Sequence, residues 1–225
     1  MKLYGDPASP YVTRVIMYAR LKDVELPRAP VPGNNPRTDE YRAINPIGKV
    51  PALDLDGYLI PESEVICEYI EDAHPGCPGL PADPRDRATS RLVARITDLY
   101  ISPQFRPLLP HLNPVHRDQA EVDRIGAELD QAFRSLEYFM GHGPFCVGAE
   151  PTLGDCALGP YMRLLKNVVF GTFETIADPT EHEGRLASWW QAMEGDALCK
   201  IALDEYGAAV DAFMRQNAAT LDQHR

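Results

Sequence analysis

The feature that most constrains the fold is a segment rich in proline and glycine, about a third of the way along the chain. Residues 74 to 84 read His-Pro-Gly-Cys-Pro-Gly-Leu-Pro-Ala-Asp-Pro, a composition that continues neither a helix nor a strand. The chain has 225 residues, enough for one large domain or two smaller ones. The segment favours two, and we predict domains at residues 1–76 and 86–225, joined by a linker at residues 77–85.

The first domain has the pattern of a small α/β fold. Lys2–Gly5 reads as a short strand, and apolar residues at helical spacing predict a helix from Pro10 to Lys22. Further predictions are a strand at 26–31, an irregular loop at 32–36, a hairpin of 51–55 and 58–60 around Asp56-Gly57, and a helix at 63–73. A β-α-β unit followed by a hairpin and a helix predicts a compact domain with a mixed sheet.

The rest of the chain reads as helical. Apolar residues recur at helical spacing in several stretches, and the longest stripe lies between residues 119 and 140. Pro103, Pro107 and Pro110 interrupt the pattern after the first stretch. The predicted helices span residues 86–100, 119–140, 152–169, 185–193 and 205–217. The second domain is therefore predicted to be all-α.

Composition and charge exclude several classes of function. The formal net charge of −11, without clustered basic residues, opposes binding to nucleic acids and to anionic membranes. No run approaches the ~20 apolar residues of a membrane span, and the start lacks the apolar stretch of a signal peptide, so we expect a cytoplasmic protein. Five cysteines without CxxC spacing, and six histidines without ligand spacing, favour reduced thiols and no metal site.

The sequence also lacks the motifs of several common enzyme classes. It contains no GxSxG elbow, no GxGxxG fingerprint and no GxxxxGK[ST] loop. This absence argues against common hydrolases, dehydrogenases and NTP-using enzymes.

Ser9, at the start of the first predicted helix, is the first candidate for chemistry. A hydroxyl there can donate to a thiolate, and the positive end of the helix dipole stabilises the negative charge. An ordinary N-cap is the alternative, and the pattern alone favours it.

A second candidate is the segment Asn45-Pro46-Ile47-Gly48-Lys49-Val50-Pro51. A cis bond between Val50 and Pro51 would present the backbone of Val50 outward, where an extended peptide could pair with it as an added strand. Lys49 could meet a carboxylate. An ordinary strand entry with a solvated lysine is the alternative, and proline counting alone leaves it open.

A third candidate is Pro61-Glu62-Ser63-Glu64, where a strand end meets a helix start. Ser63 and the first amides of the helix form an anion site, and Glu62 can accept from an ammonium group. Together they suit an α-amino acid group. Simple capping is the alternative, and in isolation it is the better interpretation.

Thr152 and Asp155 form a fourth pattern, with the spacing of a capping box in which aspartate replaces glutamate. We predict that it nucleates a buried helix and has no part in catalysis.

Taken in this order, these segments resemble the cytosolic glutathione transferase superfamily, of serine type and bacterial-like. The matching segments begin at Ser9-Pro10-Tyr11, Asn45-Pro46, Glu62-Ser63 and Pro151-Thr152, so the resemblance covers nearly the whole chain. It implies a thioredoxin-like first domain that binds glutathione, an all-helical second domain that lines an acceptor site, and a homodimer. Metal ions and nucleic acids have no part in it.

The resemblance also implies a role for each candidate residue. Ser9 occupies the position of the catalytic serine that stabilises the glutathione thiolate. Ala8 stands beside it in place of a cysteine, so a thiol-transfer or reductase role loses support. The residues assigned to glutathione, from its γ-glutamyl end to its glycyl carboxylate, are Glu62, Ser63, Val50, Pro51, Lys49 and Arg37. The acceptor pocket is expected to involve Tyr11, Tyr100, Phe105, Leu108, His111, Tyr161 and Leu165.

The activity implied is conjugation of glutathione to an electrophilic, largely apolar small molecule, which is a detoxification reaction. A glutathione-dependent enzyme with a dedicated substrate is the alternative, through β-aryl-ether cleavage, dehalogenation or isomerisation. A non-catalytic binding protein with the same fold is the third reading. The sequence does not separate these, because acceptor choice lies in residues without a readable code.

Overall fold

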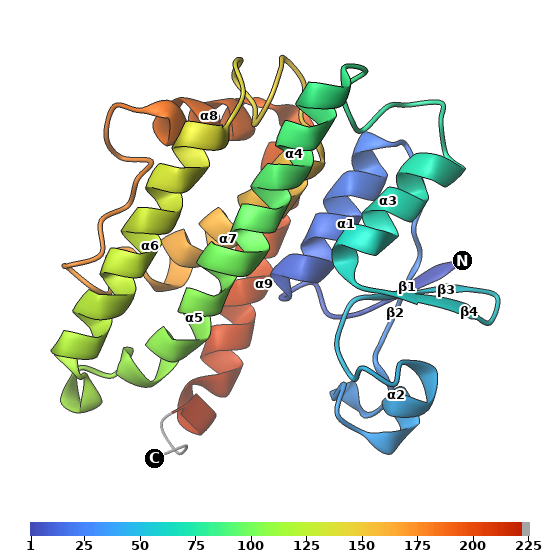
Figure 1. Ribbon diagram of the computed structural model, residues 1–225. Coiled ribbons are helices and arrows are strands. Elements are labelled where there is room, and N and C mark those ends of the chain that lie inside the picture. The colour runs from blue at the N-terminus through green and yellow to red at the C-terminus, as the bar shows by residue number, and fades with distance from the viewer. Residues whose placement is uncertain (222–225) are drawn as a thin grey trace.

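The N-terminal part of the chain forms a four-stranded sheet with helices on both faces (Figure 1). The computed structural model describes residues 1–221, and the side chains of residues 1–216. The strand order is β2-β1-β3-β4, with β2 parallel to β1 and the other pairs antiparallel, so the predicted mixed sheet is confirmed. The elements are β1 (Lys2–Tyr4), α1 (Pro10–Leu21), β2 (Arg28–Ala29), α2 (Asp39–Ile44), β3 (Ala52–Leu55), β4 (Tyr58–Pro61) and α3 (Ser63–Ala73), with a 3₁₀ turn at Pro32–Asn34.

Side-chain alternation along β1 assigns each face of the sheet its own core. Leu3 enters the large core that α1 and α3 cover. Tyr4 points to the opposite face, where it packs with Val31 and Tyr41 of α2. Figure 1 shows α1 and α3 on one side of the sheet and α2 on the other. This layering matches the expected thioredoxin-like first domain.

The structure differs from the sequence analysis in two places in this part. The strand expected at 26–31 pairs only at Arg28–Ala29, because Pro27 and Pro30 flank these residues and have no amide hydrogen for a ladder. Helix α2 was not predicted at all, because six residues are too few to display a helical period. Its local signal is Thr38, whose side chain accepts a hydrogen bond from the Tyr41 amide at 3.3 Å.

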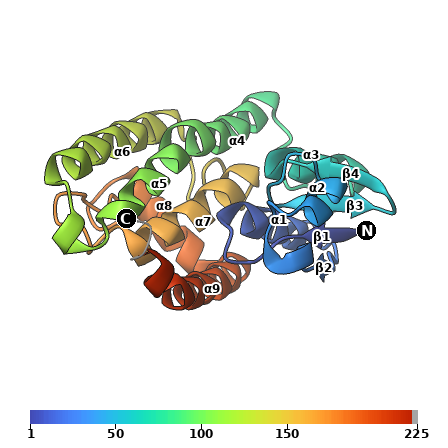
Figure 2. The same cartoon turned by 90° about the horizontal axis from the view of Figure 1, so that it is seen from below.

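The C-terminal part is a bundle of helices around the buried helix α7 (Figure 2). Helix α7 packs against α1, α4 and α9. Within the described residues, no helix is long and apolar enough to cross a membrane. The elements are α4 (Pro84–Ile96), a π-helical turn (Thr97–Ile101), α5 (Ser102–Leu108), α6 (Gln119–Phe139), α7 (Leu153–Val168), α8 (Arg185–Gly195) and α9 (Ala197–Leu221), with 3₁₀ turns at Leu109–His111 and Pro114–His116.

Helix boundaries in this part differ from the predictions in two places. The helix expected at 86–100 continues through the π-helical turn into α5, because Pro103 lies in the first turn of α5, where a missing amide hydrogen is tolerated. The helix expected at 205–217 begins eight residues earlier, at Ala197. Its start has a cap that the apolar pattern does not reveal, since the Asp196 carboxylate accepts from the Cys199 amide at 2.9 Å.

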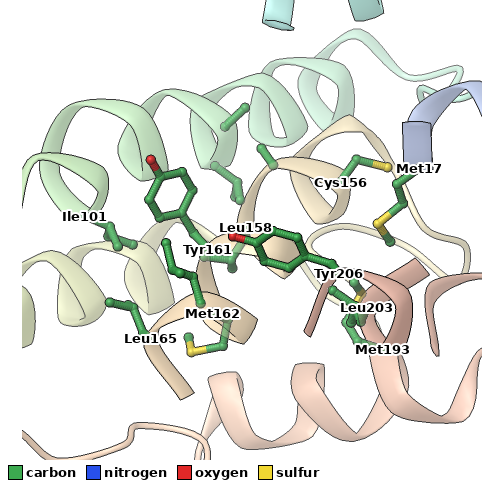
Figure 3. Close-up of a cluster of buried hydrophobic side chains, with 14 of the residues drawn as sticks. Met17, Ile101, Cys156, Leu158, Tyr161, Met162, Leu165, Met193, Leu203 and Tyr206 are labelled. Atoms are coloured by element: carbon green, nitrogen blue, oxygen red, sulfur yellow. The ribbon is translucent and has the colours of Figure 1, made fainter. Parts of the chain in front are cut away.

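The two parts of the chain share one hydrophobic core. Figure 3 shows Met17 of α1 among side chains of α7, α8 and α9, including Cys156, Met193 and Leu203. The proline-rich connection also contacts the first part, because the Gly79 amide donates to the Glu71 carboxylate at 3.1 Å. The domain boundaries at residues 76 and 86 remain a prediction.

The capping box predicted at the start of α7 is confirmed. Asp155 is fully buried, and its Oδ2 accepts from the amide and the hydroxyl of Thr152 at 2.7 and 2.8 Å. Its Oδ1 accepts from the Cys146 amide and from Trp189 Nε1, both at 2.8 Å. One carboxylate therefore joins the start of α7 to the preceding loop and to α8.

Candidate functional site

A cavity of about 380 Å³ lies where the two parts of the chain meet. Its walls come from the start of α1, the loop before β3, the first turn of α3, the end of α4 and the π-helical turn. The lining includes five of the six residues expected to bind glutathione, which are Lys49, Val50, Pro51, Glu62 and Ser63. Tyr11 also lines the cavity. The fold therefore brings three separate sequence motifs to one place.

The end of β4 and the start of α3 form one wall of the cavity. Glu62, the residue before α3, has a φ of 67°, in the left-handed region that is uncommon for residues with a side chain. Its side chain is exposed, whereas Ser63 is buried. Because Ser63, Glu64 and Val65 all line the cavity, the unpaired amides of the first turn of α3 border it. This wall can accept both an ammonium group and a carboxylate.

A buried arginine lies behind this wall. The side chain of Arg14 in α1 is 1% exposed and forms a bidentate ion pair with Asp98, at 2.9 and 2.5 Å. Its Nη1 also donates to Ser63 Oγ at 3.2 Å. Burial opposes the charged guanidinium, but the Asp98 carboxylate outweighs burial and raises the pKa of Arg14. Arg14 therefore joins α1, α3 and the π-helical turn.

The sequence analysis did not identify Arg14 or Asp98. The signal for Arg14 was a charged residue between Val12 and Val15, on a helix whose other buried residues are uncharged. Asp98 carried no local signal, because its partner lies 84 positions away in the sequence.

The loop before β3 forms a second part of the lining, next to the end of β4. The Val50–Pro51 peptide bond is cis, which is one of the two states that the sequence analysis left open. The preceding carbonyl, that of Lys49, accepts from Asn45 Nδ2 at 2.8 Å and from the Tyr41 hydroxyl at 3.0 Å. These hydrogen bonds fix the backbone beside Val50, while the Lys49 side chain is exposed.

Two of the residues predicted for catalysis or glutathione binding, Ser9 and Arg37, lie outside the lining of this cavity. Ser9 is the N-cap residue of α1 and is partly buried, and its side chain makes no capping hydrogen bond. The capping alternative for Ser9 therefore has no hydrogen bond to support it. Arg37 is exposed on the loop before α2, and its backbone amide donates to the Asn35 side chain at 2.9 Å.

A cluster of three hydroxyls includes Tyr11, which lines the cavity at the start of α1. Ser102 Oγ is 2.6 Å from the Tyr11 hydroxyl and 2.8 Å from the Tyr161 hydroxyl. The two tyrosine rings meet edge to face, with centroids 5.5 Å apart. Burial raises the pKa of Tyr161, so this phenol stays protonated. Of the residues expected in the acceptor pocket, Tyr11 and Tyr161 are thus brought together.

The other acceptor candidates are dispersed. Leu108 and Leu165 are fully buried in the core, which leaves neither side chain exposed to a pocket in this structure. Phe105 packs against the same core, and His111 accepts from the Asp118 amide through Nδ1 at 3.1 Å. Tyr100 lines a different cavity.

This second cavity, of about 770 Å³, is the α4–α6 groove, lined by residues of α4, the π-helical turn, α5 and α6. Leu92 and Tyr100 form one side, and Ala132 and Phe139 lie on the other. Within the described residues, no group of three histidine, cysteine or acidic side chains is placed to hold a metal ion.

Comparison with known proteins agrees with this arrangement. Residues 3–78 match the family model described as Glutathione S-transferase, N-terminal domain, and residues 119–192 match that of the C-terminal domain. Maleylacetoacetate isomerase from Pseudomonas aeruginosa is 34% identical over 169 residues, which cover 72% of this chain and 80% of that protein. The chain belongs to the glutathione S-transferase family.

Two further members of the family are similar to this chain. The probable maleylacetoacetate isomerase 1 of Drosophila melanogaster is 36% identical over 129 residues, 56% of this chain, and the match spans about half (51%) of the fly protein. The solved holo structure of a maleyl pyruvate isomerase, described as a bacterial Zeta-class glutathione S-transferase, aligns with a TM-score of 0.69 at 26% identity. That alignment covers 90% of this chain and 96% of the isomerase.

Proposed function

We propose that this protein is a glutathione-dependent isomerase that converts a cis maleyl-type compound into its trans isomer. The similarity to the Pseudomonas aeruginosa maleylacetoacetate isomerase, at 34% identity, carries the proposal. Isomerisation is one of the dedicated reactions that the sequence analysis left open as the alternative to conjugation. The named relatives favour it over conjugation of an apolar electrophile, which was the first expectation.

Glutathione is proposed to occupy the cavity beside α3. The Glu62 carboxylate would accept from the γ-glutamyl ammonium group, and Ser63 with the first amides of α3 would bind the γ-glutamyl carboxylate. Val50 would pair with the cysteinyl backbone. Lys49 and Arg37 are the cations proposed for the glycyl carboxylate. Support comes from the cavity, which all of these residues except Arg37 line.

Ser9 is proposed to stabilise the glutathione thiolate. Its side chain has no capping bond, which leaves the hydroxyl free to donate to sulfur at the positive end of α1. A free thiol has a pKa of ~8.5, so lowering it by one or two units raises the thiolate fraction severalfold at neutral pH.

The reaction then needs only the thiolate and a double bond. The sulfur adds to one carbon of the cis double bond, and the π electron pair moves through the adjacent carbonyl to form an enolate. The former double bond is now single and can rotate. When the enolate re-forms the double bond in the trans geometry, the carbon–sulfur bond breaks and the thiolate is released. Glutathione is therefore regenerated in every cycle.

The decisive experiment follows both the substrate and glutathione. The protein is incubated with maleylacetoacetate and glutathione, and chromatography measures the trans product while free thiol is titrated. We expect conversion that requires glutathione and leaves its concentration unchanged. Consumption of glutathione with aryl halides, without isomerisation of the maleyl compound, would favour conjugation and contradict the proposal.

Ser9→Ala is the variant that tests the thiolate assignment. We expect it to lower the isomerisation rate by about 10²-fold, the usual effect of losing one hydrogen-bond donor to a developing anion. Glutathione affinity, measured by calorimetry, should change little, because the proposed backbone and carboxylate contacts remain. Unchanged turnover would remove Ser9 from the mechanism.

We also propose that the protein is a cytoplasmic homodimer. The α4–α6 groove and the neighbouring Tyr138, which is 82% exposed, form an apolar surface suited to a second copy of the chain. All five cysteines are free thiols, which fits a reducing compartment.

A further inference from the structure

The hydroxyl cluster of Tyr11, Ser102 and Tyr161 lies at the boundary between the two parts of the chain. Its members come from α1, α5 and α7, and two hydrogen bonds of 2.6 and 2.8 Å join them. Of the three, Tyr11 also lines the cavity that contains Val50 and Glu62. A polar cluster of this kind is unusual beside an apolar core such as that around α7 (Figure 3).

The cluster has hydrogen-bonding capacity left for a ligand. Two hydrogen bonds use two of the three hydroxyl hydrogens, and hydroxyl hydrogens rotate to suit their partners. The third hydrogen can therefore turn toward a ligand oxygen. Burial raises the pKa of the Tyr161 phenol, so Tyr161 is a neutral hydrogen-bond partner of Ser102.

Two contacts hold the Tyr11 ring in place. The Arg14 guanidinium lies 5.5 Å from the centroid of the Tyr11 ring, in a cation–π contact. Edge-to-face contact with Tyr161 fixes the ring orientation. A donor held in place before the reaction stabilises a developing anion without the cost of reorganisation.

We propose that Tyr11 is a catalytic residue whose hydroxyl donates a hydrogen bond to the enolate oxygen formed when the thiolate adds to the substrate. Ser102 and Tyr161 are positioning residues that hold this hydroxyl. The inference rests on the proposed function for its substrate, since addition to a double bond conjugated with a carbonyl places charge on oxygen.

The position of Tyr11 favours it over Ser102 and Tyr161 as the donor to the enolate oxygen. Ser9 and Tyr11 both lie at the start of α1, and Tyr11 lines the cavity in which glutathione is proposed to bind. Tyr161 is only 5% exposed, and neither it nor Ser102 lines the cavity. Of the three hydroxyl residues, Tyr11 is therefore the one that a substrate in this cavity can reach.

The test compares substrates that differ in where charge develops. Tyr11→Phe and the native protein are assayed with maleylacetoacetate, with a simple aryl enone and with benzyl chloride. Addition of the thiolate to the first two creates an enolate. Substitution at benzyl chloride creates no enolate, because the negative charge leaves on the chloride ion. We expect Tyr11→Phe to lower kcat about 10²-fold on the two carbonyl substrates and less than about threefold on benzyl chloride.

Two further variants separate catalysis from packing. Tyr161→Phe keeps the hydrogen bond between Tyr11 and Ser102, so we expect a smaller loss than in Tyr11→Phe. Ser102→Ala keeps the Tyr11 hydroxyl but removes the atom that holds it, and should give an intermediate loss with the same substrate pattern. Thermal unfolding and glutathione affinity are measured for each variant, to establish that it is folded and binds.

The outcomes distinguish this inference from the proposed function. If the native protein does not isomerise maleylacetoacetate, the proposed function fails. The role of Tyr11 is then decided by comparing the loss of kcat in Tyr11→Phe on the enone with its loss on benzyl chloride. Equal losses of Tyr11→Phe on all substrates, or no loss on any, overturn the inference. A larger loss in Tyr161→Phe than in Tyr11→Phe also overturns it, because the donor would then be Tyr161.

Discussion

Glu62 has the least favourable backbone conformation among the residues of the candidate site. Its φ of 67° costs a residue with a side chain about 1 to 2 kcal/mol. Such strain persists where the surrounding structure demands it, and it occurs preferentially at functional sites. Here it places an exposed carboxylate beside the first amides of α3, which is the arrangement that an amino acid group requires.

Replacing Glu62 with glycine should separate stability from binding. Glycine adopts this φ without strain, so we expect Glu62→Gly to raise the free energy of unfolding by about 0.5 kcal/mol. Loss of the carboxylate should weaken glutathione binding about tenfold, because a hydrogen bond to a charged group is lost. Denaturant unfolding and calorimetry measure the two effects.

Asp56→Gly is the matched control for that experiment. Asp56 has a φ of 53° in the hairpin between β3 and β4, away from the cavity lining. This variant should gain similar stability and keep its glutathione affinity. Equal weakening of binding in both variants would contradict the role of Glu62.

At the scale of elements, α7 organises the helical part and depends on one carboxylate. Asp155 accepts four hydrogen bonds, from Thr152, Cys146 and Trp189, and is fully buried. The same helix carries Tyr161 of the hydroxyl cluster. The start of α7 therefore determines both the packing of the bundle and the position of one group near the site.

We expect Asp155→Ala to lower the free energy of unfolding by about 3 kcal/mol or more, because it leaves several buried donors without an acceptor. Thr38→Ala, at the less buried cap of α2, provides the comparison and should cost about 1 kcal/mol. Chemical denaturation monitored by tryptophan fluorescence measures both. A loss in Asp155→Ala no larger than that in Thr38→Ala would show that this network is dispensable.

At the scale of the whole molecule, one group of exposed apolar side chains lies along α4, the π-helical turn and α6. Figure 2 shows α4 and α6 on the side opposite α9. The α4–α6 groove contains Phe139, which is 47% exposed and in edge-to-face contact with Tyr138. An apolar groove of this size, bordered by exposed aromatic rings, is the surface on which we expect a second copy to bind.

Phe139→Asp should therefore separate the two copies. A buried, unpaired carboxylate and a lost aromatic contact are expected to weaken self-association about 10²-fold or more. Light scattering after size exclusion should report half the native mass at micromolar concentration. Ile201→Asp, on the exposed face of α9, is the control and should leave the mass unchanged. A dimer that survives Phe139→Asp would exclude the groove as the interface.

Local sequence signals determined most elements and the motifs of the site. The helical period of α1, α6 and α7, the Asp56-Gly57 hairpin and the capping box at Thr152 are all encoded within a few residues, so the sequence alone predicted them. The placement of Glu62 and Ser63 at a helix start followed from a motif of the same kind, whereas the residues left the cis bond at Pro51 open and the structure shows it.

Only the tertiary structure decided what meets across the two parts of the chain. The Arg14–Asp98 ion pair and the contacts of Ser102 with Tyr11 and Tyr161 join residues 59 to 91 positions apart, and no local pattern encodes such pairs. The structure also places Leu108 and Leu165 in the core, which sequence alone did not decide, because a helical period indicates that a face is buried but not what covers it. Sequence periodicity reports each element's own geometry, whereas a site between domains depends on how the elements pack.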